Sequence, residues 1–69
     1  MKNATNIAKA IRSRRVERRL TQDQLALLSG VVVSLISRYE NGHIAPSLAT
    51  LDKIAKALRV PAGDLLKAG

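Results

Sequence analysis

The chain of 69 residues is long enough for a single domain, near the lower limit at which one hydrophobic core is stable without disulfides or a metal. It has no cysteine, a single histidine (His43) and no apolar run near the roughly 20 residues that cross a bilayer. Disulfides, a metal site, a cofactor, a signal peptide and a membrane span are therefore not expected, and the net charge of +7 favours a soluble cytoplasmic protein that binds polyanions.

Gly and Pro fall only at the joints between apolar segments of helical period, and no strand-like alternation is sustained. The periodicity and the capping residues predict five helices, at about residues 4–18, 22–29, 32–41, 48–58 and from Pro61 onward. We therefore expect one compact all-α domain over residues 1–69.

The first predicted helix has Ala4, Ile7, Ala8 and Ile11 on its inner face. The first 20 residues contain one acid and most of the basic side chains: Lys2, Lys9, Arg12, Arg14, Arg15, Arg18 and Arg19. This concentration of charge favours a nucleic-acid partner. The alternatives are a merely solubilising charge or an anionic membrane surface, and a single aromatic residue weakens the membrane alternative.

The next two predicted helices are joined by a tight turn. Thr21 is a good N-cap for the helix over 22–29, and Gly30 is suited to its left-handed end. The helix over 32–41 stops at Asn41-Gly42. Two short helices around a glycine are the layout of a helix-turn-helix, here at about residues 21–41, whose second helix is built to enter a DNA groove.

The C-terminal third is predicted to complete the core. Ser47 caps the helix over 48–58, and the last short helix carries Leu65 and Leu66. The buried stripe of the longer helix is expected to be Leu48, Leu51, Ile54, Ala55 and Leu58.

Two charged residues fall on faces that should be buried. Arg15 lies in line with Ala8 and Ile11, and Glu40 lies near Ile36. Because a lone buried charge is costly, we expect Arg15 and Glu40 to form an ion pair between the first and third helices. The alternative is that both side chains reach solvent separately.

The helix over 32–41 has Val32, Leu35, Ile36 and Tyr39 toward the domain and an opposite polar face. That face is formed by Ser34, Ser37, Arg38 and Asn41, with Val33 at its edge. An ordinary solvated surface would look similar, but this face is short, compact and nearly free of acids, and it follows a capped helix by a tight glycine turn. Arg can chelate guanine O6 and N7, Ser reads donor or acceptor edges, and Val can contact a thymine methyl group. Gln22 can bond a phosphate beside the positive end of its helix.

The segments LTQDQLA, Gly30, SLISRYENG and PSLATLDKIAKALRVPAGDLL together resemble the Cro/cI-type helix-turn-helix family, also called the xenobiotic-response-element family. The resemblance covers nearly the whole chain. It implies a five-helix, lambda-repressor-like domain that binds a palindromic operator in the major groove as a homodimer, and it supports the Arg15–Glu40 pair.

The resemblance also implies roles for individual residues. Base edges would be read by Val33, Ser34, Ser37 and Arg38. Gln22 would touch the phosphate backbone. Apart from the resemblance, we expect phosphate contacts from Thr21, from Arg15 and other arginines of the first helix, from Asn41 and from the loop around His43. The usual dimer surface lies toward the C-terminus, where the candidates are Val60, Pro61, Leu65 and Leu66.

This chain departs from the family pattern at several positions. Val32 stands where a capping Ser or Thr is usual, so a cap of roughly 1 kcal/mol should be missing. Arg19 and Arg59 stand where Gly is common, which predicts left-handed strain. Leu27 and Leu28 replace residues that are often polar; we expect Leu28 to pack and leave Leu27 either packed or exposed as a contact surface.

The sequence thus predicts a sequence-specific DNA-binding transcriptional regulator, of the repressor type, that works without catalysis. The alternative is an antitoxin-like module that binds a partner protein and its own promoter. An enzyme is disfavoured, because no nucleophile, base and orienting group can be assembled from one His, no Cys and scattered Ser.

Overall fold

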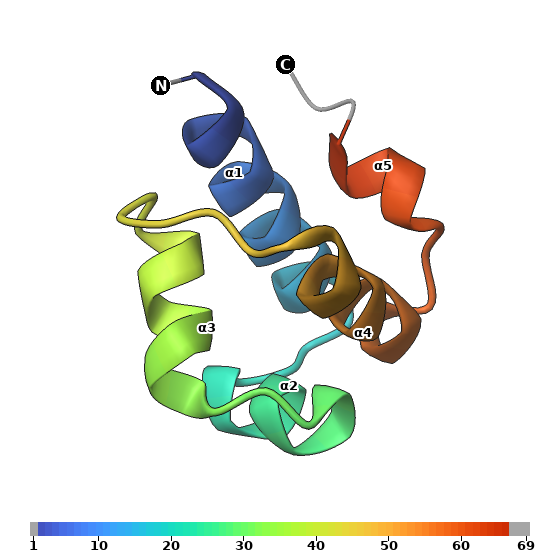
Figure 1. Ribbon diagram of the computed structural model, residues 1–69. Helices are drawn as coiled ribbons and strands as arrows, with labels where there is room; N and C mark the ends of the chain where they lie inside the picture. Colours follow the sequence, from blue (N-terminus) through green and yellow to red (C-terminus); the bar gives the residue numbers. More distant parts are fainter. Residues whose placement is uncertain (1, 67–69) are drawn as a thin grey trace.

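The computed structural model describes the backbone of residues 2–66 and the side chains from residue 6 onward. Its helices are α1 (Lys2–Glu17), α2 (Gln22–Ser29), α3 (Val33–Glu40), α4 (Leu48–Leu58) and α5 (Ala62–Leu66) (Figure 1). The expected five-helix, all-α architecture is confirmed, with boundaries close to those predicted. The expectation that the Ala4 side chain faces the core lies outside the described side chains.

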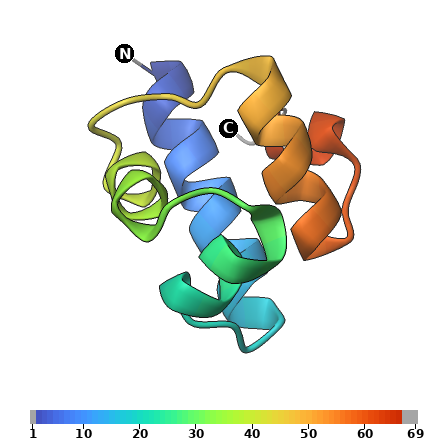
Figure 2. The ribbon, with the colours of Figure 1, turned by 60° about the horizontal axis from the view of Figure 1, so that its bottom comes forward.

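Helix α1 runs through the centre of the domain. It packs against α3 on one side and against α4 and α5 on the other, while α2 crosses the end of the molecule and packs on both α3 and α4. Figure 2 shows α2 lying between α3 and α4. The largest fully buried side chains come from all five helices: Ile11, Leu25, Ile36, Leu51, Ile54, Leu58 and Leu65.

The predicted helix caps are present. The Thr21 hydroxyl accepts from the Gln24 N–H at 3.0 Å while the Gln24 side chain accepts from the Thr21 N–H at 2.8 Å, a complete capping box. The Ser47 hydroxyl accepts from the Thr50 N–H at 3.1 Å. These bonds satisfy N–H groups that the first turns of α2 and α4 would otherwise leave unpaired.

The left-handed strain predicted for two arginines is also observed. Arg19 follows α1 with φ of 58°, and Arg59 ends α4 with φ of 60°. A side chain in this region costs about 1 kcal/mol or more relative to the right-handed conformation.

Three of the apolar side chains expected to face the core are exposed instead. Leu48 is 73% exposed, because it is the first residue of α4 and precedes the part of the helix that reaches the core. Leu28 is 60% exposed, because the inner face of α2 is centred on Leu25 and Ser29 and turns away from it. Val32, 61% exposed, lies in the connection before α3.

Candidate nucleic-acid interface

The turn between α2 and α3 is closed by Gly30 and Ser29. Gly30 adopts φ of 75°, and its N–H donates to the Ala26 carbonyl at 2.9 Å. The Ser29 hydroxyl accepts from the buried Val31 N–H at 3.2 Å. The sequence identified the glycine, but the contribution of Ser29 depends on the path of the chain after it, which no local pattern reveals. The turn fixes the direction in which α3 leaves α2.

Helix α3 has one buried and one solvent-facing side. Ile36, Tyr39 and Glu40 are buried. The polar residues predicted to read DNA lie on the other side, with Ser34 and Arg38 exposed and Ser37 partly exposed. The exposed apolar and amide side chains on this face are Val33 and Asn41.

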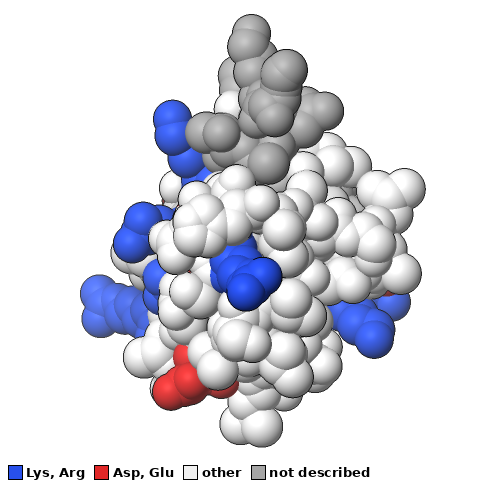
Figure 3. All heavy atoms as spheres, turned by 60° about the vertical axis from the view of Figure 1, so that its left-hand side comes forward, with Lys and Arg blue, Asp and Glu red and all other residues white. Residues whose placement is uncertain are grey.

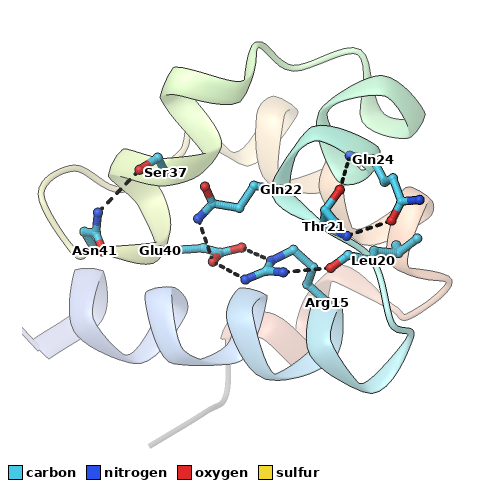
Figure 4. Close-up of polar contacts among 8 residues, drawn as sticks. All are labelled: Arg15, Leu20, Thr21, Gln22, Gln24, Ser37, Glu40 and Asn41. Atoms are coloured by element: carbon cyan, nitrogen blue, oxygen red, sulfur yellow. Dashed lines mark hydrogen bonds and ion pairs between the residues drawn. The ribbon is translucent and has the colours of Figure 1, made fainter.

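Ser37 and Asn41 are linked along this outer face. The Asn41 amide nitrogen donates to the Ser37 hydroxyl at 3.4 Å, a long bond between exposed groups one helical turn apart (Figure 4). Such a bond is easily exchanged for one to another partner, so both side chains remain available at the surface.

The N-terminal end of α3 lacks a side-chain cap, as the sequence predicts. Val32 is the N-cap residue and makes no side-chain hydrogen bond. Its carbonyl accepts from the N–H groups of Leu35 at 3.1 Å and Ile36 at 3.2 Å, so the first turn is tightened in the 3₁₀ manner. An exposed valine thus marks the start of the helix whose outer side is polar.

Arg15 and Glu40 form the predicted ion pair where α1, α2 and α3 meet (Figure 4). Arg15 Nε donates to Glu40 Oε2 at 2.6 Å, and Nη2 donates to Oε1 at 3.0 Å. Arg15 Nη1 donates to the Leu20 carbonyl at 2.7 Å, and Gln22 Nε2 donates to Glu40 Oε1 at 3.1 Å. The Glu40 side chain is 1% exposed and that of Arg15 is 12% exposed. All three helices are therefore tied to one carboxylate.

The hydrogen bonds that Arg15 donates to Glu40, reinforced by the negative charge of that carboxylate, raise the pKa of Arg15 against the opposing effect of burial. A raised arginine pKa means that the stabilisation is fully present below the ordinary pKa of the group and is lost only as the pH rises through the higher, folded-state value. The cation of this pair thus persists through the whole working pH range.

These contacts change the roles expected for two residues. Arg15 was predicted to bind phosphate, but its guanidinium donates from all three nitrogens to Glu40 and Leu20 and is nearly buried. Gln22 donates one of its two amide hydrogens to Glu40. The bond from Gln22 was missed because it depends on how closely α2 approaches α3. Both side chains hold α3 in place, and Gln22 retains its second amide hydrogen.

The remaining predicted phosphate-binding residues lie at the surface. Thr21, Asn41 and His43 are exposed, Thr21 at the start of α2 and the other two just after α3. Figure 3, with the α3 side of the molecule turned forward, shows basic groups at both sides and near the centre of a largely uncharged surface, with an acidic patch low on the left. Cations distributed over this side suit the phosphate backbone of a polyanion.

The predicted dimer candidates divide into exposed and buried residues. Pro61 and Leu66 are exposed and Val60 is partly buried. Leu65 is 0% exposed and belongs to the hydrophobic core, so its proposed place on a dimer surface is wrong for this fold. None of the described helices is long and apolar enough to cross a membrane.

Known proteins resemble this chain in sequence and in fold. The chain is 49% identical over 61 residues to the HTH-type transcriptional repressor RghR of Bacillus subtilis (strain 168), covering 86% of this chain and 45% of the relative. It is 41% identical over 56 residues to the cryptic phage CTXphi transcriptional repressor RstR of Vibrio cholerae, covering 81% of this chain and 50% of the relative. The chain thus spans half or less of the length of these curated relatives.

A solved structure matches nearly end to end. The restriction-modification controller protein C.AhdI from Aeromonas hydrophila superposes with a TM-score of 0.90 at 29% identity, covering 94% of this chain and 98% of that chain. The family model described as helix-turn-helix matches residues 11–65. The chain belongs to the helix-turn-helix family.

Proposed function

We propose that this chain binds double-stranded DNA in a sequence-specific manner and represses transcription, without a catalytic step. The observation that carries the proposal is the outer face of α3: short polar side chains and one arginine, exposed and free of acids, on a helix held rigidly by the Arg15–Glu40 pair. Two relatives named as transcriptional repressors and a controller protein of the same fold support it.

The side chains of α3 suit base edges in the major groove. Arg38 carries the one positive charge of this helix and would donate two hydrogen bonds to guanine O6 and N7. Ser34 and Ser37 would bond base edges on either side, and Val33 would pack against a thymine methyl group. Contacts to phosphate would come from Thr21, Asn41, His43 and the second amide hydrogen of Gln22, alongside the N-terminus of α2.

The size of one domain supports dimeric binding. The Cα atoms of the domain extend 27 Å along the longest axis, whereas half-sites read from one side of the duplex lie about 34 Å apart. One copy therefore covers one half-site. Val60, Pro61 and Leu66, near the C-terminal end, offer apolar surface through which two copies would pair.

Selection of DNA from a random-sequence duplex library by the purified chain tests the function. The expected result is an inverted repeat whose half-site centres are about 10 base pairs apart, with conserved G and T positions in each half. The proposal is contradicted if the library shows no enrichment after several rounds and all binding is lost between low and moderate salt. The protein would then bind DNA only through non-specific electrostatic attraction.

A further inference from the structure

Helix α2 carries two exposed leucines that lie outside the hydrophobic core. Leu27 is 84% exposed and Leu28 is 60% exposed. Consecutive residues of an α-helix point about 100° apart, so the two leucines are separate exposed groups, and Leu28 is the one that lines a groove of the surface. Neither belongs to the predicted base-reading set on α3, so DNA reading leaves them unexplained.

Leu28 borders a groove between the C-terminal ends of α2 and α4. This open groove, of about 420 Å³, is lined by Leu28, Ser29, Lys53, Lys56, Ala57 and Arg59. Its lining is apolar at Leu28 and Ala57 and basic at Lys53, Lys56 and Arg59, which are called its rim below. In Figure 2, α4 lies on the opposite side of α2 from α3, so the groove does not overlap the outer face of α3.

The charge of the groove is strongly one-sided. Three of its lining residues are cations, and none is an acid. Lys56 lies 3.2 Å from Asp52, but both side chains are more than half exposed, and such a surface pair is weak. Lys53 lies too far from the end of α4 to be explained as a partner for the carbonyl groups of the last turn. Arg59 keeps a left-handed conformation where glycine would be less costly, and so adds a third cation to the rim.

We infer that this groove docks an acidic, amphipathic segment of another protein. Large apolar side chains of that segment cover Leu28 and Ala57, and its Asp or Glu side chains pair with Lys53, Lys56 and Arg59. Charge complementarity of this kind sets partner choice and association rate, and the apolar contact holds the bound state.

A second copy of this chain does not supply such a segment. Of its five acids, Glu40 is buried, and the other four lie one each on α1, α2, α4 and α5, at Glu17, Asp23, Asp52 and Asp64. No single segment of the described chain therefore presents two acids together. A phosphate backbone satisfies the cations but leaves Leu28 in water. A peptide that is both acidic and apolar is therefore the occupant that satisfies both the cations and the apolar residues of the groove.

Selection from a displayed library of random peptides, using the whole chain as bait, tests this inference. The expected consensus is Asp or Glu flanking Leu, Ile or Phe. A labelled peptide of that consensus should bind at least tenfold more weakly to Leu28→Ser and to Lys53→Glu than to the unchanged chain. Recovery of peptides without acidic residues, or no recovery, overturns the inference.

Matched control variants distinguish binding at the groove from non-specific hydrophobic or electrostatic binding elsewhere on the surface. Leu48→Ser removes a leucine that is 73% exposed at the far end of α4, and Lys9→Glu reverses an exposed lysine on α1; both should change peptide affinity less than twofold. Equal losses in the controls, or displacement of the peptide by a random-sequence duplex, overturn the inference, the latter in favour of DNA. Self-association that Leu28→Ser abolishes overturns it in favour of a second copy. Circular dichroism melting of each variant confirms that it is folded.

Discussion

The two ends of α3 are held in opposite ways. The C-terminal end is fixed by Glu40, whose carboxylate accepts hydrogen bonds from α1 and α2, and by Gly42, which turns the chain at φ of 74°. The N-terminal end begins at Val32 with no side-chain cap and is exposed. Several polar contacts thus fix the C-terminal end of α3, whereas its N-terminal end begins with an exposed apolar residue.

The buried C-terminal end of α3 therefore sets the orientation of the helix, while the exposed N-terminal end is free to contact a ligand. A buried, charged network has few alternative geometries, because any displacement leaves a charge without its partner, so it sets the angle of α3. Val32 and Val33 contribute little to that angle. Their side chains are exposed and available to a ligand.

Removing the network should have the largest effect. Glu40→Ala leaves the guanidinium of Arg15 nearly buried without its carboxylate, and we expect a loss of about 3 to 5 kcal/mol in the free energy of unfolding. For a domain of this size that corresponds to a fall of roughly 12 °C or more in Tm. Thermal melting followed by circular dichroism measures it.

Glu17→Ala is the matched control, because Glu17 also lies beside an arginine, at 3.9 Å from Arg14, but with a side chain 67% exposed. It should change the stability by less than about 0.5 kcal/mol. Similar melting temperatures for the two variants would show that the Glu40 pair is no stronger than a surface pair.

The two ends of α3 also differ in how far the sequence predicts them. The Arg15–Glu40 pair was predictable because helical phase alone puts both residues on inner faces, where neither charge is stable alone. The missing cap at Val32 could be read directly from the residue type. The bond from Gln22 to Glu40 could not, because it depends on the approach of α2 to α3.

The same limit applies to the leucines. Leu65 and Leu66 are adjacent in the sequence, and only the docking of α5 against α1 and α4 decides which of them is buried. Leu28 lies at the edge of the short inner face of α2. A small rotation of α2 about its axis would decide whether the Leu28 side chain is buried or exposed. Local pattern therefore predicts the elements and their caps, while relative placement of the helices decides the remaining contacts.

Arg38→Ala should have an intermediate effect, confined to recognition. Loss of two hydrogen bonds to guanine should weaken binding to the selected operator by roughly 10- to 100-fold while changing binding to random-sequence DNA far less. Fluorescence anisotropy at one fixed salt concentration measures both affinities. Arg12→Ala removes an exposed arginine of α1 and should lower both affinities by the same factor. If Arg38→Ala behaves as Arg12→Ala does, Arg38 contacts phosphate and the bases are read by other residues.

Restoring the missing cap should have the smallest effect and makes the comparison quantitative. Val32 has φ of −62° and ψ of 146°, which already suits an N-cap, so the hydroxyl of Val32→Thr can accept from an N–H of the first turn without rearrangement. The expected gain is about 1 kcal/mol of stability, seen as a rise in Tm. Val33→Thr makes the same chemical change one residue later, inside the helix, where no cap can form, and should give no gain. Equal stabilities would mean that the 3₁₀-type bonds to the Val32 carbonyl already satisfy this end of α3. A stability gain in Val32→Thr accompanied by weaker operator binding would instead identify the exposed valine as a DNA contact, retained at the expense of the cap.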